Sequence, residues 1–191
     1  KQEFLESCNL YHPNQIGNSI TIYKDENEIP ELDGFELAII GVEEDRNSFN
    51  NKGCKDAPNA IRKSLYQLFN HWKDIKIIDL GNIKTGFGIE DTYFALNKVV
   101  MTLMKYRIVP IILGGSQDLT YPIYKVYENT GKLVNITSID SRFDIGQDNE
   151  ELNSNSYLSY IILHQPSFLF NYTNIGYQSY YVDNQSANLM K

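Results

Sequence analysis

Five short apolar runs recur along this chain, and helical periodicity or polar residues fill the intervals between them. Runs of about four to eight apolar residues that are separated by helices are typical of buried parallel strands joined in βαβ units. The pattern therefore predicts an α/β protein, a three-layer α/β/α sandwich with a mostly parallel sheet and helices on both faces. The expected strands lie near residues 36–42, 75–79, 108–113, 133–139 and 172–177.

The intervals contain the expected helices. Pro58 suits the first turn of one helix, because the N–H that proline lacks would have no partner there. That helix is predicted to run to about His71 and to bury one apolar face. The face consists of Ile61, Leu65, Leu68 and Phe69. Other helices are predicted from Thr92 to about Tyr106 with Asp91 as N-cap, from about Leu119 to Tyr127, and from about Ser154 to His164.

Composition narrows the function classes. The net charge of −7 and the lack of a basic run with interleaved aromatics argue against a nucleic-acid surface. No apolar stretch approaches the roughly 20 residues of a spanning helix, so no membrane association is expected. Cys8 and Cys54 lie far apart in no metal-binding spacing, which favours a reducing, cytoplasmic environment.

Polar residues follow two of the expected strands. Gly114 and Gly115 lead into Ser116-Gln117-Asp118, and the next run leads into residues 140–144, which read Asp-Ser-Arg-Phe-Asp. In open parallel sheets, ligands bind outside the carboxyl ends of the strands. The sequence therefore predicts a site at these two strand ends.

The two stretches resemble the metal motifs of the ureohydrolase family (arginase, agmatinase, formiminoglutamase), which read Gly-Gly-Asp-His-Ser and Asp-Ala-His-x-Asp. Residues 53–62 are similar to the family's Gly-Ala-x-x-Gly-Pro-x-Ala-Ile-Arg segment, residues 78–82 to its Asp-x-Gly-Asp strand end, and residues 174–178 to its Ile-Gly-Ile-Arg strand. Residues 119–122 and 161–166 look most like the formiminoglutamase-like branch. Residues 1–34 are then expected to be an N-terminal extension packed on a ureohydrolase-like domain, residues 35–191. The family's later Asp-x-Asp metal segment is missing, so we expect a partial chain that leaves a sheet edge or face exposed.

The resemblance implies a metal site that is degenerate in this chain. Family members hold two Mn²⁺ ions, which activate a bridging water for attack on an amidine carbon. Asp140 and Asp144 match carboxylate ligands, whereas Gln117 and Arg142 occupy the two imidazole positions. A guanidinium cannot ligate a cation. Two alternatives follow for Arg142: it forms a salt bridge with a carboxylate in place of the metal, or it points outward from solvated turn residues.

Several other polar residues are weaker candidates. Asp118 is expected to cap the following helix, and Asp183 to cap or precede another. The three histidines, His12, His71 and His164, are expected to be structural or exposed rather than ligands. The tyrosines that are dense from residue 157 to 181 suit either core packing or a contact in a homo-oligomer.

These observations favour a ureohydrolase-fold protein, formiminoglutamase-like by resemblance, that acts as a pseudoenzyme without a bound cofactor. Its expected role is binding or scaffolding, with an amino-acid-like small molecule or another subunit as partner. The first alternative is a Mn-dependent hydrolase of linear amidine or guanidine C–N bonds with a non-standard metal site. The second alternative is a purely structural domain.

Overall fold

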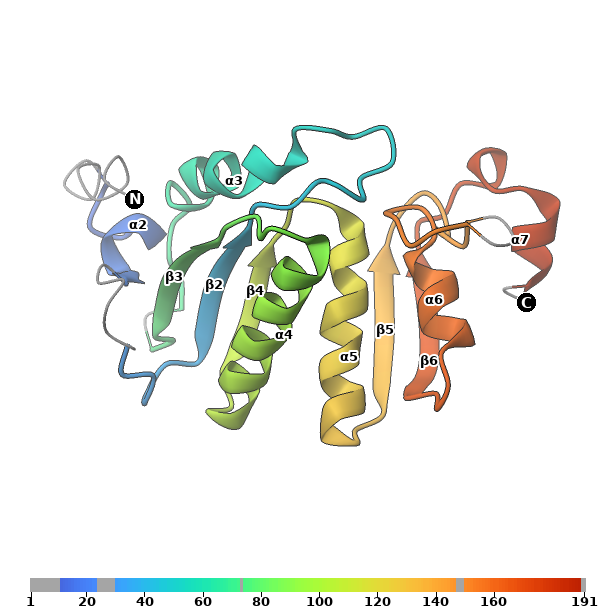
Figure 1. The fold of residues 1–191 in the computed structure, drawn as a ribbon. Helices are drawn as coiled ribbons and strands as arrows, with labels where there is room; N and C mark the ends of the chain where they lie inside the picture. Colours follow the sequence, from blue (N-terminus) through green and yellow to red (C-terminus); the bar gives the residue numbers. More distant parts are fainter. Residues whose placement is uncertain (1–10, 24–29, 73, 147–149, 190–191) are drawn as a thin grey trace. The chain divides into compact units, whose positions relative to one another are not determined.

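The computed structural model describes residues 11–23, 30–72, 74–146 and 150–189. Figure 1 shows α-helices and parallel strands alternating along the chain. The chain divides into two compact units, which are described separately. The first comprises the described parts of Lys1–Asp45 and Lys52–Gly115, and the second comprises Arg46–Asn51 and the described parts of Ser116–Lys191. Within the described residues, no helix has both the length and the apolar character needed to cross a membrane.

The first unit contains a four-stranded parallel sheet in the order β1-β3-β2-β4. Residues 21–22, in the expected N-terminal extension, form β1 at one edge of this sheet, beside β3. The three longer strands match the apolar runs of the sequence. The strands are β1 (Thr21–Ile22), β2 (Leu37–Val42), β3 (Ile77–Ile83) and β4 (Val109–Leu113).

Helices cover both faces of this sheet, as the apolar pattern predicts. Ala38 and Ile40 of β2 pack with Leu103 of α4 (Ile89–Lys105), which lies in front of the sheet in Figure 1. Side chains alternate along a strand, so Gly41 faces the other way. A Cβ on Gly41 would lie 2.8 Å from Cβ of Pro58 in α3 (Ala57–Leu65), which places α3 on the opposite face.

Two helix predictions need correction. The helix that begins near Pro58 ends at Leu65 rather than His71, and Leu68 and Phe69 beyond it are exposed. Its buried residues are Pro58 and Arg62, because its inward face carries an ion pair instead of an apolar stripe.

The second correction concerns α4, which begins at Ile89 with Gly88 as N-cap. Asp91 lies one turn inside the helix, and its carboxylate accepts a hydrogen bond from the Gly88 N–H at 2.8 Å. Asp91 is therefore the third helical residue, and its carboxylate provides the acceptor for the N–H of the N-cap residue Gly88.

The second unit is a βαβ arrangement with a two-stranded parallel sheet. Tyr124 of α5 packs with Tyr157, Leu158 and Ile161 of α6 against one face of this sheet. The main elements are α5 (Thr120–Thr130), β5 (Val134–Ile139), α6 (Tyr157–Leu163), β6 (Leu169–Ile175) and α7 (Asn184–Leu189).

On the other face of the two-stranded sheet, residues of the same type lie opposite each other on β5 and β6. Ile139 pairs with Ile175, and these two are 84% and 53% exposed. The next two pairs on the same face are Thr137 with Thr173 and Asn135 with Asn171. The expectation of an exposed sheet face is therefore confirmed for the described part of this unit.

Candidate functional site

Gly115, two residues after the end of β4, allows two loops of the first unit to approach closely. A Cβ on Gly115 would lie 2.0 Å from the carbonyl oxygen of Glu44, which follows β2. No side chain fits at that distance, so only glycine is compatible with this backbone path. The chain then enters the 3-10 turn η3 (Gln117–Leu119) of the second unit.

Gln117, at the first imidazole position of the family motif, points toward a tyrosine. Its Nε2 lies 3.4 Å from the hydroxyl oxygen of Tyr157 in α6. Tyr157 is only 1% exposed, and Ser138 at the end of β5 is also hydrogen-bonded to it. Burial raises the pKa of Tyr157 to about 12, so the phenol is protonated at neutral pH.

The carboxylates after β5 lie in a turn rather than along an extended strand. Oδ1 of Asp140 accepts a hydrogen bond from the backbone N–H of Arg142 at 3.0 Å. This local bond turns the chain, so Asp140, Arg142 and Asp144 do not share one face of a continuing strand. Asp144 itself has a φ of 49°, which is uncommon for a residue with a Cβ.

The charge state of Asp144 depends on its surroundings. Burial, together with the nearby charge of Asp140, raises the pKa of Asp144 to about 6, while Arg142 opposes the rise. A carboxyl group that titrates near pH 6 is ionised at neutral pH but gains a proton under mildly acidic conditions.

The predicted salt bridge of Arg142 is wrong. Within the described residues, Arg142 forms no ion pair with Asp140 or Asp144. Its guanidinium lies instead over the ring of Tyr181, 5.1 Å from the ring centroid, and its side chain is exposed. Arg142 is thus a cation held by an aromatic face, which leaves N–H groups available to a ligand.

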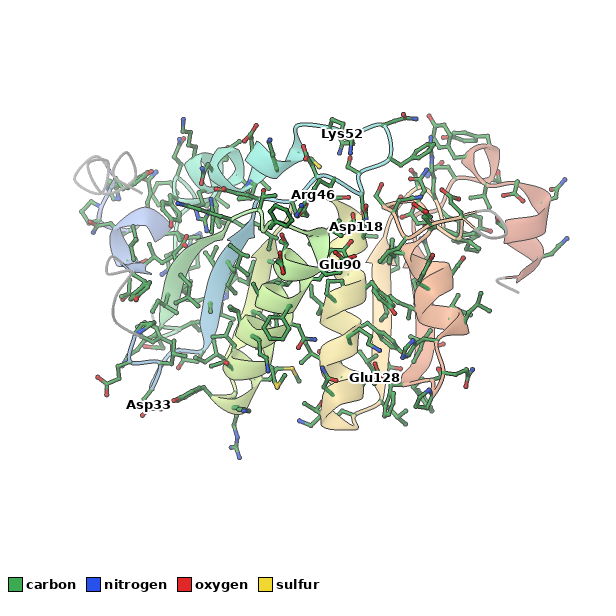
Figure 2. All side chains as sticks on the ribbon, viewed as in Figure 1. Asp33, Arg46, Lys52, Glu90, Asp118 and Glu128 are labelled. Atoms are coloured by element: carbon green, nitrogen blue, oxygen red, sulfur yellow. The ribbon has the colours of Figure 1, made fainter. Side chains whose placement is uncertain are left out.

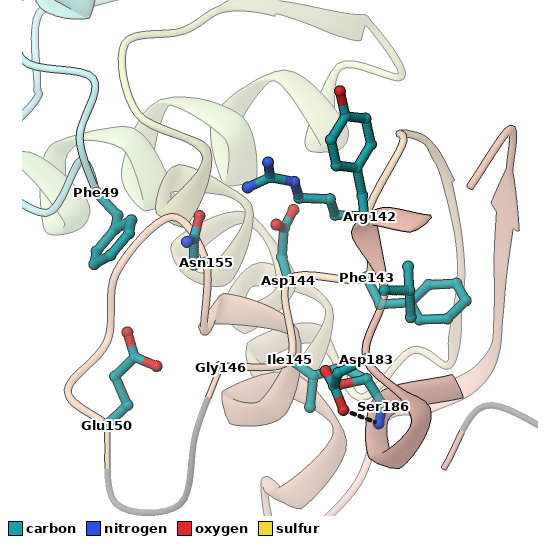
Figure 3. Close-up of a pocket in the computed structure, with 12 residues that line it drawn as sticks. Phe49, Arg142, Phe143, Asp144, Ile145, Gly146, Glu150, Asn155, Asp183 and Ser186 are labelled. Atoms are coloured by element: carbon teal, nitrogen blue, oxygen red, sulfur yellow. Dashed lines mark hydrogen bonds between the residues drawn. The ribbon is translucent and has the colours of Figure 1, made fainter. Parts of the chain in front are cut away.

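Asp144 and Arg142 line a cavity of about 380 Å³ within the second unit. Figure 3 shows the carboxyl group of Asp144 and the guanidinium of Arg142 on the same side of this cavity. Asp183 also contributes, and it accepts hydrogen bonds from the backbone N–H and the hydroxyl of Ser186, as expected for a residue that caps α7. The remaining lining residues include Phe49, Phe143, Glu150, Asn155 and Tyr181.

The residues present do not fit a two-metal centre. Across the described ranges, no group of three or more His, Cys, Asp or Glu side chains could hold a metal ion. Gln117 offers only an amide oxygen in place of an imidazole nitrogen, and Arg142 brings a fixed positive charge. The four positions that resemble the family's ligands, Gln117, Arg142, Asp140 and Asp144, therefore offer a cation two carboxylates.

Asp118 is placed differently from the prediction. It is fully buried and accepts a hydrogen bond from the hydroxyl of Ser116, whereas the N-cap of α5 is Leu119, with no side-chain cap bond. Figure 2 shows Asp118 near the N-terminal end of α5 and Glu128 near the opposite end. At that opposite end, Nε2 of His164 lies 3.0 Å from Oε1 of Glu128 and 3.1 Å from Nζ of Lys125, so His164 makes structural contacts there.

Sequence reasoning treated Arg62 only as part of a family segment and missed its role. Arg62 is 3% exposed, and its Nε and Nη2 donate to the two carboxylate oxygens of buried Asp79 at 2.7 and 3.0 Å. Nη2 also donates to the Gly81 carbonyl at 2.9 Å, and Nη1 donates to Asn82 and, at 3.4 Å, to Asn59. All five guanidinium N–H groups are therefore used, which makes Arg62 a structural residue. The available signal was an aspartate inside an apolar strand, because a buried carboxylate needs a partner.

Comparisons with known proteins agree with this fold. The family model described as "Arginase family" matches residues 35–190. The chain is 27% identical over 162 residues to a formimidoylglutamase of Lysinibacillus sphaericus, covering 81% of this chain and 50% of that protein. It is 26% identical over 136 residues to an agmatinase of Blochmanniella floridana, covering 65% of this chain and 45% of that protein.

Two solved structures share the fold at low sequence identity. Formimidoylglutamase of Bacillus subtilis superposes with a TM-score of 0.75 at 16% identity, covering 92% of this chain and 56% of that one. Trypanosoma cruzi formiminoglutamase, solved with Mn²⁺, superposes with a TM-score of 0.72 at 19% identity, covering 92% and 61%. The chain thus spans half or less of the curated relatives and a little over half of the solved chains. On the family match over most of its length, this chain belongs to the arginase family.

Proposed function

We propose that this chain is a non-catalytic member of the arginase family that binds an amino-acid-like molecule in the cavity beside Asp144. The observation that supports this proposal most strongly is that Gln117 and Arg142 stand at the two imidazole positions of the family motif. Together they remove two nitrogen ligands and add a cation where the motif would hold one. The resulting site suits a ligand with charges of its own better than a metal pair.

Electrostatics supports this proposal. Two unit charges of the same sign repel by about 4 kcal/mol at 4 Å when the effective dielectric constant is near 20. A Mn²⁺ ion near Arg142 would meet such repulsion with only Asp140 and Asp144 to offset it.

The cavity has the groups that a zwitterion requires. The exposed guanidinium of Arg142 can take a carboxylate in a bidentate pair. Asp144 and Glu150 can accept hydrogen bonds from an ammonium, and Phe49 and Tyr181 supply apolar walls. A volume of about 380 Å³ suits a small molecule of this kind.

Metal analysis tests the non-catalytic part of the proposal. Full-length protein purified without chelator should contain no stoichiometric Mn²⁺ by mass spectrometry and should not hydrolyse a linear amidine. The double variant Gln117→His with Arg142→His should raise the Mn²⁺ affinity in calorimetry, because it restores two ligands and removes a charge. A Gln67→His variant, at an exposed position of the first unit, is the matched control. Stoichiometric Mn²⁺ together with hydrolysis by the unmodified protein would instead establish the hydrolase alternative.

Ligand binding is tested separately with L-glutamate and L-arginine as probes. Binding of either probe should weaken at least about tenfold in Arg142→Met, since one charge-assisted hydrogen bond contributes about 1.5–3 kcal/mol. No binding of either probe, with a metal-free protein, would favour the structural alternative.

A further inference from the structure

A buried polar group beside the motif residues is the hydroxyl of Tyr157, a residue that is 1% exposed. It comes from α6 and meets three segments of the second unit. Gln117 of η3 approaches to 3.4 Å, Ser138 of β5 is hydrogen-bonded to it, and the charge of Asp144 in the following loop contributes to the rise in its pKa. A hydroxyl that is removed from water in this way needs such partners, because an unpaired buried polar group is costly.

These partners are at or beside the family's ligand positions. Gln117 replaces the first imidazole, Asp144 matches a carboxylate ligand, and Ser138 precedes Asp140 by two residues. A ligand atom binds Mn²⁺ at roughly 2 Å, so a metal would have to occupy the space directly beyond the Gln117 side chain. The tyrosine hydroxyl already lies on that side of Gln117.

We infer that the Tyr157 hydroxyl replaces the metal as the group that joins η3, β5 and α6. The inference rests on the proposed non-catalytic function and adds the positioning residue that makes a metal-free site stable. A neutral hydroxyl has no charge to balance, so Arg142 is free to lie over Tyr181 and the cavity can remain open to a ligand. The same role of the Tyr157 hydroxyl explains why Gln117 is compatible with this fold, since the Gln117 amide can donate a hydrogen bond to the phenol oxygen.

A double-mutant cycle between Gln117→Leu and Tyr157→Phe tests this contact directly. The two changes should be coupled in the urea-unfolding equilibrium, so the double variant loses less than the product of the single losses. Each single change is expected to lower the folding constant by a factor of about three to ten. Tyr160→Phe, on the same helix, is the matched control and should show no coupling with Gln117→Leu. Independent effects of the two changes would overturn the inference, and a parallel cycle with Ser138→Ala gives the same decision should Gln117→Leu fold poorly.

Metal binding gives a second readout that separates this inference from the proposed function. Adding Tyr157→Phe to the Gln117→His/Arg142→His variant should tighten Mn²⁺ binding by about tenfold or more, because it frees the new imidazole from the hydroxyl. Equal affinity of the double and triple variants would reject Tyr157 as the occupant of that space. Stoichiometric Mn²⁺ in the unmodified protein would reject the proposed function, while the unfolding cycle would still decide whether Tyr157 joins these segments.

Discussion

Replacing Arg62 with methionine should destabilise the first unit more than any single change at the degenerate metal motif. The change removes both hydrogen bonds to Asp79, at 2.7 and 3.0 Å, and leaves a carboxylate that is 2% exposed. Among the described residues, Asp79 would keep as donors the Tyr66 hydroxyl at 2.5 Å and the Gly81 N–H at 2.8 Å. Removing one partner of such a buried pair costs about 3–5 kcal/mol, because the other charge stays buried without compensation.

The measurement is urea unfolding, followed by circular dichroism and by the fluorescence of Trp72, the single tryptophan of the chain. With a slope of about 2 kcal/mol per molar urea, the midpoint should fall by about 1.5–2.5 M. Arg142→Met is the control, and it should cost less than about 1 kcal/mol because that guanidinium is exposed over an aromatic ring.

A double variant of the Arg62–Asp79 ion pair gives a further test. Arg62→Met combined with Asp79→Asn should be more stable than the sum of the single effects indicates, since no buried charge is left without a partner. A loss below about 1 kcal/mol for Arg62→Met alone, or strict additivity in the double variant, would refute the assignment of Arg62 as the partner of a buried charge.

Three further predictions follow from local geometry. Burial raises the pKa of Asp144 to about 6, so the protonated carboxyl group contributes stability below about pH 4, and this contribution is lost as the pH rises through 6. Asp144→Asn should therefore make the unfolding midpoint less dependent on pH between about 4 and 6. The pKa of Glu128 is lowered, first by its bond to Lys125 and then by His164, so Glu128→Gln should cost up to about 1 kcal/mol at pH 7 and progressively less as the pH falls below 4; an equal cost at pH 3 would contradict the ion pair. Gly115→Ala should lower the yield of folded protein or cost about 3 kcal/mol or more by thermal unfolding, whereas Gly131→Ala, where nothing lies within 4 Å, should cost about 1 kcal/mol.

The strands were the part of the fold that local pattern could predict. The predicted runs start one residue before β2, β4 and β5. A fourth run overlaps β3, which begins two residues later than expected, and β6 begins three residues earlier than expected. Helix ends were less predictable, because they depend on single hydrogen bonds such as that between Gly88 and Asp91. The end of α3 was misjudged because Leu68 and Phe69 continue its apolar spacing without being buried.

The sequence alone determined the strand positions and the residue types that follow the strands, Gln117 and Arg142 among them, since each depends on the residues within a few positions. Tertiary structure decided which polar groups meet. Arg62 finds Asp79 17 residues away, and Gln117 finds Tyr157 40 residues away. Such partners depend on how elements pack, and no periodicity along the chain encodes those distances. For the same reason local pattern did not predict that the Arg142 guanidinium lies over the ring of Tyr181, after a turn in which the Asp140 side chain accepts a hydrogen bond from the Arg142 N–H.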